Sequence, residues 1–295
     1  MNRSETYKSA MRLKDYVTLG NLLCGFAAII ALFHDQFELA CGLVYLAWVF
    51  DWLDGLVARA LHQYDRFGAE LDTVCDYITN SIVLAFIVFY AFERVAGYPT
   101  WAAALLGAFP LVFGTIRQAR SQSDPQSYPC YWLGLPRPIL ALLIVSMFGS
   151  SLFRVDEGMQ NWGHGVAAGL LVILSAMHLT KIPFLNHKNR RNTYMVKVGV
   201  WWFLGGTPVV IAISKYFFGN FELFFDYLFF SMMSYTFVNW TQIPRDDFRR
   251  IRRFVETGEL ELPLVHKDSD WRSKRFAPFF DPAGDTPESQ SVDSP

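Results

Sequence analysis

The fold is set by residues 43–90, which read LVYLAWVFDWLDGLVARALHQYDRFGAELDTVCDYITNSIVLAFIVFY. Two apolar runs flank a middle segment that carries four aspartates, Asp51, Asp54, Asp72 and Asp76. Residues three or four apart lie on one face of a helix, so the first two aspartates share a face, and so do the last two. An antiparallel hairpin of two helices would bring the four carboxylates together near one end.

These aspartates adjoin apolar sequence rather than a long polar loop. Asp51 directly follows LVYLAWVF, and Asp76 directly precedes YITNSIVLAFIVFY. A carboxylate at the centre of a membrane helix costs roughly 2.5–3.5 kcal/mol, so acids at such positions normally have a cationic partner. The alternative, that they are ordinary loop residues, leaves this placement unexplained. Hard divalent cations prefer oxygen ligands, and two such ions flanking a phosphate form a known catalytic arrangement.

Apolar runs recur along the whole chain of 295 residues, of which 52% are hydrophobic and 18% charged. A membrane span needs about 20 mostly apolar residues. We therefore expect an all-α, polytopic transmembrane bundle with spans near residues 16–33, 39–58, 73–92, 98–116, 135–153, 162–180, 198–214 and 221–240. With eight spans, nearly all of the 26 Lys and Arg residues fall on one side, which the positive-inside rule makes cytoplasmic. Both termini are then cytoplasmic.

Composition also excludes several classes of protein. The formal net charge of −1 gives no basic field that would attract a nucleic acid. The four cysteines form no CxxC pair, which disfavours a disulfide framework or a zinc site. No cleavable signal peptide is evident. A basic cluster follows the last span, and it either reflects the positive-inside rule or contacts lipid headgroups: Arg249, Arg250, Arg252 and Arg253. The polar tail from Pro278 is expected to be disordered.

Small residues and a cation accompany the aspartates. Gly55, Ala58 and Gly68 leave room either for a bulky ligand near the backbone or for close helix packing. Arg59 could bind phosphate oxygens. The whole segment reads Asp-x2-Asp-Gly-x2-Ala-Arg-x8-Gly-x3-Asp-x3-Asp over residues 51–76. It resembles, at every defining position, the signature of the CDP-alcohol phosphatidyltransferase family.

The resemblance covers roughly residues 12–180 and implies a six-span core followed by about two extra C-terminal spans. We accordingly divide the chain into a cytoplasmic N-terminal segment, the family core, the additional spans and a polar cytoplasmic tail, at residues 1–15, 16–180, 181–243 and 244–295. The family's members commonly form homodimers, which implies one here. The implied location is a bacterial-type cytoplasmic (inner) membrane, with the active site facing the cytoplasm.

The resemblance implies phosphoryl transfer from a CDP-linked lipid to an alcohol, with release of CMP. By analogy, two divalent ions, Mg or Mn, would be bound by Asp51, Asp54, Asp72 and Asp76. Asp76 would also be the base that takes the proton of the acceptor hydroxyl. The CDP pocket would be lined by Gly55, Ala58, Arg59 and Gly68.

Three segments are similar to the branch of the family that uses serine and makes phosphatidylserine. They are TLGNLLCGF at 18–26, GAELDTVCD at 68–76 and GLPRP at 134–138. In the first, Asn21 either helps to hold the nucleotide or makes an interhelical hydrogen bond. Residues 77–82, YITNSI, depart from the branch, and this places the acceptor pocket in question.

Three arginines near the cytoplasmic side are candidate ligands of the acceptor's carboxylate or of a lipid phosphate: Arg117, Arg120 and Arg137. The alternative is that they only reflect the positive-inside rule. The same chemistry with choline, inositol, inositol phosphate or glycerol phosphate as acceptor stays open. A cation transporter that uses the aspartates as its ion site is the alternative from another class. The expected partners are thus CDP-diacylglycerol, a small alcohol such as serine, and membrane lipids.

Overall fold

The computed structural model describes residues 11–62, 66–123, 127–128, 131–151, 153, 160–185 and 194–258. The helical elements in these residues are α1 (Leu13–Phe33), α2 (Phe37–Ala60), α3 (Arg66–Tyr77), η1 (Ile78–Val83), α4 (Leu84–Tyr90), η2 (Ala91–Val95), α5 (Thr100–Ser123), α6 (Arg137–Gly149), α7 (Gln160–Met177), α8 (Tyr194–Ile213), η3 (Ser214–Phe218), α9 (Glu222–Val238), η4 (Asn239–Gln242) and α10 (Arg245–Thr257). The strands are β1 (Ser127–Tyr128), β2 (Tyr131–Leu133) and β3 (Pro183–Leu185).

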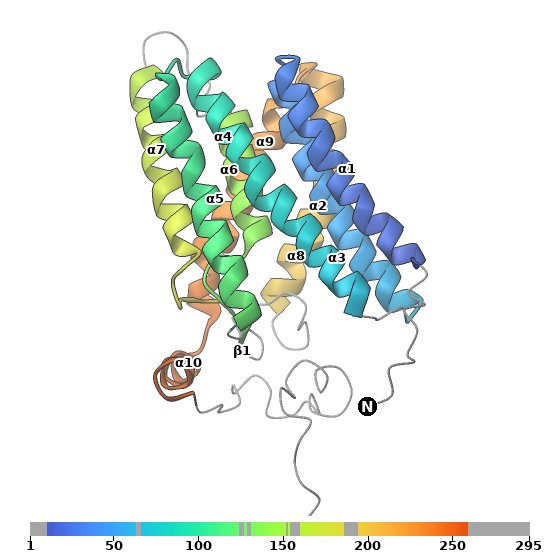
Figure 1. Cartoon of the computed structure of the whole chain (residues 1–295), viewed down its shortest axis with the longest axis vertical. Coiled ribbons are helices and arrows are strands. Elements are labelled where there is room, and N and C mark those ends of the chain that lie inside the picture. Colours follow the sequence, from blue (N-terminus) through green and yellow to red (C-terminus); the bar gives the residue numbers. More distant parts are fainter. Residues whose placement is uncertain are drawn as a thin grey trace, which may run out of the picture. The chain divides into compact units, whose positions relative to one another are not determined.

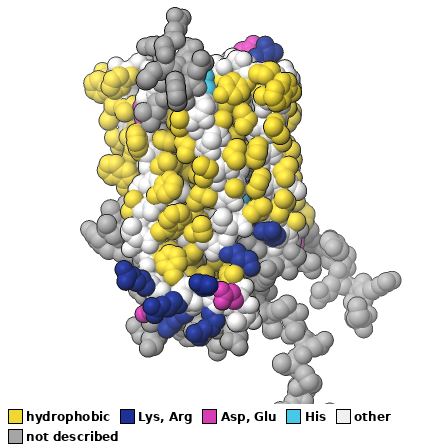
Figure 2. Space-filling model, turned by 90° about the vertical axis from the view of Figure 1, so that its left-hand side faces the viewer, with side chains coloured by type: hydrophobic (Ala, Val, Ile, Leu, Met, Phe, Trp, Pro, Cys, Tyr) yellow, Lys and Arg dark blue, Asp and Glu magenta, His cyan; other side chains and the backbone are white. Residues whose placement is uncertain are grey.

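A helix stands at each of the eight places where the sequence predicts a span, so the helical, polytopic fold is confirmed. Among the described residues, four stretches are long and apolar enough to cross a membrane: Leu13–Phe33, Phe37–Ala60, Phe67–Val95 and Thr100–Ser121. Shorter apolar helices occupy Arg137–Gly149, Gly163–Met177 and Trp202–Phe218. The helices run side by side along the bundle (Figure 1), and apolar side chains follow them on the face shown in Figure 2.

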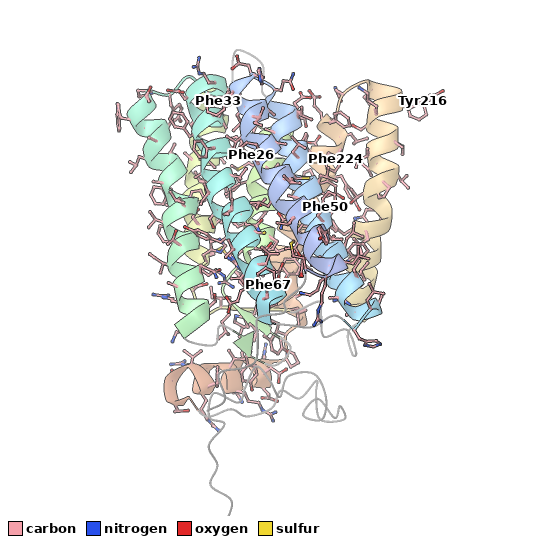
Figure 3. All side chains as sticks on the ribbon, turned by 45° about the vertical axis from the view of Figure 1, so that its right-hand side comes forward. Phe26, Phe33, Phe50, Phe67, Tyr216 and Phe224 are labelled. Atoms are coloured by element: carbon pink, nitrogen blue, oxygen red, sulfur yellow. The ribbon has the colours of Figure 1, made fainter. Side chains whose placement is uncertain are left out.

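Packing is densest where α1 lies along α2, and α1 also contacts α3 and η1. Gly20 permits this approach, because a Cβ atom there would lie 2.7 Å from the ring of Phe50 (Figure 3). On the outer side of α1, Phe26 and Phe33 are exposed, as suits a surface that faces lipid. The helix α6 packs against α2 and α9, and its residues from Leu140 to Gly149 are all buried. The core of the bundle thus lies around α6.

The helix that carries the second pair of aspartates begins earlier than the apolar run predicts. The expected span began at residue 73, whereas helical structure is continuous from Arg66 to Val95. It contains two π-helical segments, η1 directly after Asp76 and η2 at its end. Such segments are rare and occur frequently at functional sites. The departure at residues 77–82 therefore coincides with a change of helix type.

Besides the expected helices, the described residues contain three short strands. A small antiparallel sheet, in the order β1-β2-β3, joins the segment before α6 to the segment after α7. Its register pairs Tyr131 with Leu185 and Trp132 with Phe184. Strands of two or three residues give no alternating pattern that a sequence could reveal, and they form here because the two connections meet in space.

The chain divides into two compact units, Met1–Ile243 and Pro244–Pro295. In the second unit, the predicted polar tail contains the helix α10, whose arginines form ion pairs along the helix. Arg249 contacts Asp246 at 3.5 Å, and Arg252 contacts Glu256 at 2.8 Å. The tail from Pro278, predicted to be disordered, lies outside the described residues.

Candidate functional site

The helix α3 and the C-terminal part of α2 lie at the same end of the bundle (Figure 1). Three of the four aspartates, which these helices carry, come together there. Asp51, Asp72 and Asp76 can each offer one carboxylate oxygen such that all three oxygens lie within 4.8 Å of one another. All three side chains are half-buried. Clustered carboxylate oxygens are the ligands that Mg²⁺ and Mn²⁺ prefer. The donor set therefore fits a divalent cation, and three of the four carboxylates that were expected to meet lie close together.

Asp54 lies outside this group of three. Its side chain is buried, 8% exposed, and its Oδ2 accepts a hydrogen bond of 2.6 Å from the hydroxyl of Thr18 on α1. The sequence spacing places Asp54 on the face of Asp51, one helical turn away. In the structure, one carboxylate oxygen of Asp54 is hydrogen-bonded to α1.

Asn21 lies one turn after Thr18 on α1 and reaches the other end of the motif. Its Nδ2 donates to Asp76 Oδ1 at 3.1 Å. The side chain is 1% exposed, and its Oδ1 has no hydrogen-bond partner among the described residues. A buried amide oxygen without a donor is costly unless a ligand supplies one. Of the two predicted roles, the interhelical hydrogen bond is present, and contact with a nucleotide stays a prediction.

The other residues predicted to line a nucleotide pocket lie on the same two helices. A Cβ at Gly55 would be 3.4 Å from Arg59 Nη1, so the guanidinium of Arg59 extends back over Gly55. Arg59 is exposed and Ala58 half-buried, while Gly68 on α3 is buried. The structure thus leaves an accessible cation beside the aspartates on α2.

Arg117, predicted as an acceptor or phosphate ligand, is bound to the main chain. It is 6% exposed, and its Nη1 donates to the carbonyls of Leu133, at 3.0 Å, and His178, at 2.8 Å. Gly134 makes room for it with a left-handed φ of 77°, since a Cβ there would lie 2.7 Å from Arg117 Nη1. The segment at residues 134–138 is therefore part of the arginine's support.

The two remaining candidate arginines lie around this turn. Arg120 Nη1 lies 3.4 Å from the carbonyl of Leu179 at an exposed position. Arg137, at the first residue of α6, donates to the side-chain oxygen of Gln118. Arg120 lies in the last turn of α5, and Arg137 contacts Gln118 of the same helix. The binding role of both arginines stays a prediction.

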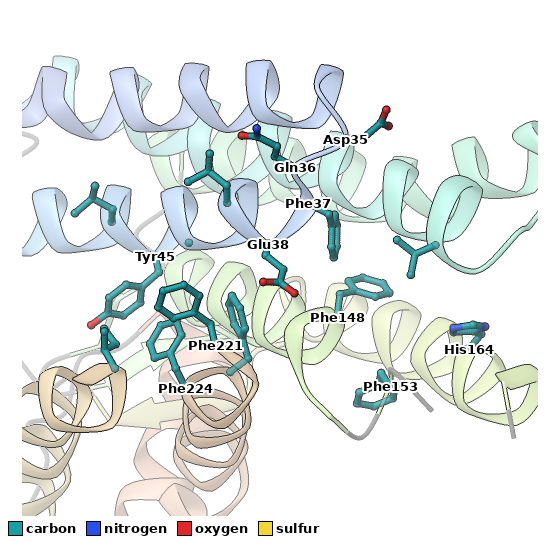
Figure 4. A pocket seen from close by; sticks show the side chains of 16 residues that line it. Asp35, Gln36, Phe37, Glu38, Tyr45, Phe148, Phe153, His164, Phe221 and Phe224 are labelled. Atoms are coloured by element: carbon teal, nitrogen blue, oxygen red, sulfur yellow. The ribbon is translucent and has the colours of Figure 1, made fainter. Parts of the chain in front are cut away.

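A separate cavity of about 1060 Å³ lies at the other end of α2 (Figure 4). At 1.5 Å per residue, Glu38 at its rim is about 20 Å along the helix from Asp51. Aromatic side chains from α2, α6 and α9 contribute to its walls, including Tyr45, Phe148 and Phe224. None of the predicted site residues lines it, so this cavity and the aspartates are distinct.

Thr18 is the residue at this site that the sequence reasoning missed. The signal that could have found it is its spacing from Asn21. Residues three apart share a helix face, so a face that brings Asn21 to one aspartate can bring Thr18 to another.

Comparisons with known proteins cover the part of the chain that carries these residues. The profile of the CDP-alcohol phosphatidyltransferase family matches residues 11–180. A Helicobacter pylori (strain J99) protein is 29% identical over 181 residues, covering 58% of this chain and 70% of that protein. A Methanocaldococcus jannaschii protein is 32% identical over 202 residues, covering 68% of this chain and 87% of its own. Both relatives are named CDP-diacylglycerol–serine O-phosphatidyltransferase.

Proposed function

The chain belongs to the CDP-alcohol phosphatidyltransferase family, and we propose that it transfers the phosphatidyl group of CDP-diacylglycerol to the hydroxyl of serine. The products are phosphatidylserine and CMP. The identity of the acceptor is supported by relatives of about 30% identity that carry the serine name. As a member of this family with several apolar helices, the chain is an integral membrane protein.

The observation that carries the proposal is the approach of the three carboxylates of Asp51, Asp72 and Asp76 to within 4.8 Å. Together with Asp54 they would hold two divalent ions, Mg or Mn. Such ions, when bound, supply positive charge that offsets the charge of the diphosphate and of the departing CMP. The carboxylates orient this charge, and the half-buried setting of the site limits competition from water.

Asp76 is the proposed base. It takes the proton of the serine hydroxyl as the serine oxygen forms its bond to phosphorus, and the bond from phosphorus to the CMP oxygen breaks. Asn21 donates to Asp76 Oδ1 and thereby helps to orient the carboxylate. A positioned base of this kind contributes about 10²- to 10⁴-fold to a rate.

Arg59 is the proposed ligand of the nucleotide's phosphates. Its guanidinium lies over Gly55, where the lack of a side chain keeps the backbone of α2 accessible. Ala58 and Gly68 complete the proposed CDP pocket with small side chains. An arginine binds phosphate oxygens through charge-assisted hydrogen bonds that are stronger than neutral ones.

The proposed acceptor ligands are Arg117, Arg120 and Arg137. Arg117 donates through Nη1 to two main-chain carbonyls. Its Nε and Nη2 also carry N–H groups, and these would bind the carboxylate of serine. The main-chain bonds fix the direction of these groups before serine arrives. Such preorganisation reduces the entropy cost of binding.

The remaining expectations form part of the same proposal. Residues 16–180 are the catalytic core, 181–243 add about two spans, and 244–295 form a cytoplasmic tail. Both termini and the active site face the cytoplasm, as the distribution of Lys and Arg suggests. The membrane is a bacterial-type cytoplasmic membrane, and the enzyme is a homodimer.

The test is release of CMP by the purified protein from CDP-diacylglycerol, in Mg²⁺ or Mn²⁺, with a panel of alcohols. We expect release that requires serine and stops when EDTA removes the metal. Release with choline, inositol, inositol phosphate or glycerol phosphate instead would keep the chemistry and reject the serine assignment. No release with any alcohol from a folded protein that binds metal would reject the enzyme and favour the cation transporter.

A further inference from the structure

Thr18 is the side chain that holds Asp54. Thr18 and Asp54 are 2% and 8% exposed, and the distance of 2.6 Å between Oγ1 and Oδ2 is that of a charge-assisted hydrogen bond. The two residues are 36 positions apart, so this bond ties α1 to α2. No other hydrogen bond from a side chain to Asp54 is formed among the residues that the structure describes.

The hydroxyl of Thr18 has one proton and two acceptors within reach. The carbonyl of Lys14, one turn earlier on α1, lies 3.0 Å away. A threonine in a helix commonly donates to such a carbonyl. Here the contact to the carboxylate oxygen of Asp54 is the shorter of the two, so the proton lies toward Asp54. The bond commits Oδ2 and leaves Oδ1 to face a ligand.

The geometry points to Thr18 as a positioning residue: we propose that its hydroxyl sets the orientation of Asp54, so that one chosen carboxylate oxygen is presented to a divalent ion. The inference rests on the proposed metal role of Asp54. Residues that orient a metal ligand typically change metal affinity by about 10- to 100-fold when mutated.

Close approach of α1 makes this bond possible. Gly20 lies between Thr18 and Asn21 in sequence, and the ring of Phe50 fills the space where a side chain would be. The same turn of α1 therefore supplies one donor to Asp54 and one to Asp76. One helix thus orients an aspartate of each half of the motif.

The experiment compares Thr18→Val, which keeps the shape of the side chain and removes the hydroxyl, with Thr18→Ser, which restores the hydroxyl. The matched control is Thr236→Val on α9. Thr236 is fully buried and donates only to the carbonyl of Met232 within its own helix, at 2.8 Å. The intact purified protein is titrated with MnCl₂ alone, without lipid or alcohol, and binding is followed by Mn²⁺ EPR and by the rise in unfolding temperature.

We expect Thr18→Val to weaken Mn²⁺ binding by about 10-fold or more, with Thr18→Ser and Thr236→Val close to wild type. Equal Mn²⁺ affinity in Thr18→Val and wild type would overturn the proposal, even if the variant unfolds at a lower temperature. Because the readout involves no substrate, it stays decisive if the protein transfers no phosphatidyl group.

A double-mutant cycle covers the case in which Thr18→Val folds poorly. Asp54→Asn is combined with Thr18→Ser and with Thr18→Ala, and Mn²⁺ affinity is measured for each single and double variant. If Thr18 acts through Asp54, removing the hydroxyl has no further effect on affinity once the carboxylate is absent. Additive losses from Thr18→Ala and Asp54→Asn would contradict the proposed route.

Discussion

The aspartates and the candidate arginines are charged groups of one bundle that are held in different ways. Asp54 and Asp76 are each held by a side chain of α1, the hydroxyl of Thr18 and the amide of Asn21. Arg117 is held by main-chain carbonyls, those of Leu133 and His178. A side-chain donor can be removed without disturbing a turn of the backbone, whereas a main-chain acceptor belongs to the turn itself.

The difference predicts how each group fails when it is changed. Loss of an aspartate should impair metal binding and chemistry while the bundle stays folded. Loss of Arg117 should first destabilise the connection between β2, the Gly134 turn and the end of α7, because the arginine satisfies carbonyls from both sides of it. Four substitutions or titrations test this contrast.

The largest effect is expected for Asp76→Asn. The variant keeps the volume of the side chain but removes the proposed base, so CMP release should fall by about 10²- to 10⁴-fold. The unfolding temperature and the binding of CDP-diacylglycerol should change little. The measurement is the rate of CMP release beside a thermal unfolding curve of the same sample.

Asp35→Asn is the matched control for this change. Asp35 lies at the opposite end of α2 and accepts a hydrogen bond of 2.8 Å from the hydroxyl of Tyr90. Its left-handed φ of 56° is one that asparagine adopts readily. Its CMP release should equal that of wild type. Unchanged release in Asp76→Asn would refute the assignment of the base.

The next effect concerns Arg117→Met, which removes the guanidinium and keeps a long apolar chain. The carbonyls of Leu133 and His178 then lose their donor, at a cost of about 1–3 kcal/mol for each buried group left unsatisfied. We expect a clear fall in the unfolding midpoint. Arg120→Met should stay within about 0.5 kcal/mol of wild type, because its contact of 3.4 Å is exposed.

The variant Arg117→Met also shows whether the arginine supports the turn, binds the acceptor or does both. If Arg117→Met unfolds like wild type but shows a greatly raised KM for serine, its charge serves the acceptor alone, and the main-chain bonds are dispensable. If the midpoint falls and the KM for serine also rises, the arginine both supports the turn and binds the acceptor.

The positions of the helices were predictable because apolar runs of the right length are visible in the sequence. The span predicted at 39–58 is the helix Phe37–Ala60, and that at 221–240 is Glu222–Val238. The start of α3 at Arg66 was not predictable from hydropathy, because the segment around the aspartates is polar. The strands were missed because they depend on two distant connections that meet in space.

The aspartate pairs followed from helical spacing, and the structure brings three of the four together. The turn of Asp54 toward Thr18 could not follow, since it depends on how α1 is rotated against α2. The hydrogen-bond acceptors of Arg117 could not be predicted either, because every residue has a main-chain carbonyl and the sequence does not show which one an arginine will reach. Spacing therefore predicts which residues share a face, and tertiary packing decides what that face meets.

A smaller effect is expected for Asn21→Leu, which keeps the approximate size of the side chain and removes the donor to Asp76. A hydrogen bond to a charged group contributes about 1.5–3 kcal/mol. CMP release should therefore fall by about 10- to 150-fold, less than the upper range expected for Asp76→Asn. Asn21→Asp, which replaces the donor with a like charge, should be worse than Asn21→Leu, and the reverse order would contradict the hydrogen bond.

The smallest effect is a pH dependence that arises in the support of Arg117. His178 lies in the turn after α7, and its Nδ1 donates to the carbonyl of Leu135 at 2.7 Å. Burial, together with the positive charge of Arg117, lowers the pKa of His178 to about 3 from an ordinary value of 6.5. The folded protein therefore keeps this histidine neutral throughout the range in which the unfolded chain takes up a proton.

Because the unfolded state binds more protons between these two pKa values, stability falls as the pH drops below about 6.5, by about 1.4 kcal/mol per pH unit. The unfolding midpoint should thus decrease from pH 7 to pH 5. His178→Asn, whose Nδ2 can replace Nδ1 as the donor to Leu135, should remove most of this slope, whereas His34→Asn at the exposed end of α1 serves as the control. An equal dependence of the unfolding midpoint on pH in His178→Asn and wild type would mean that acid destabilises another part of the bundle. The turn that holds Arg117 would then be no more sensitive to protons than the helices that hold the aspartates.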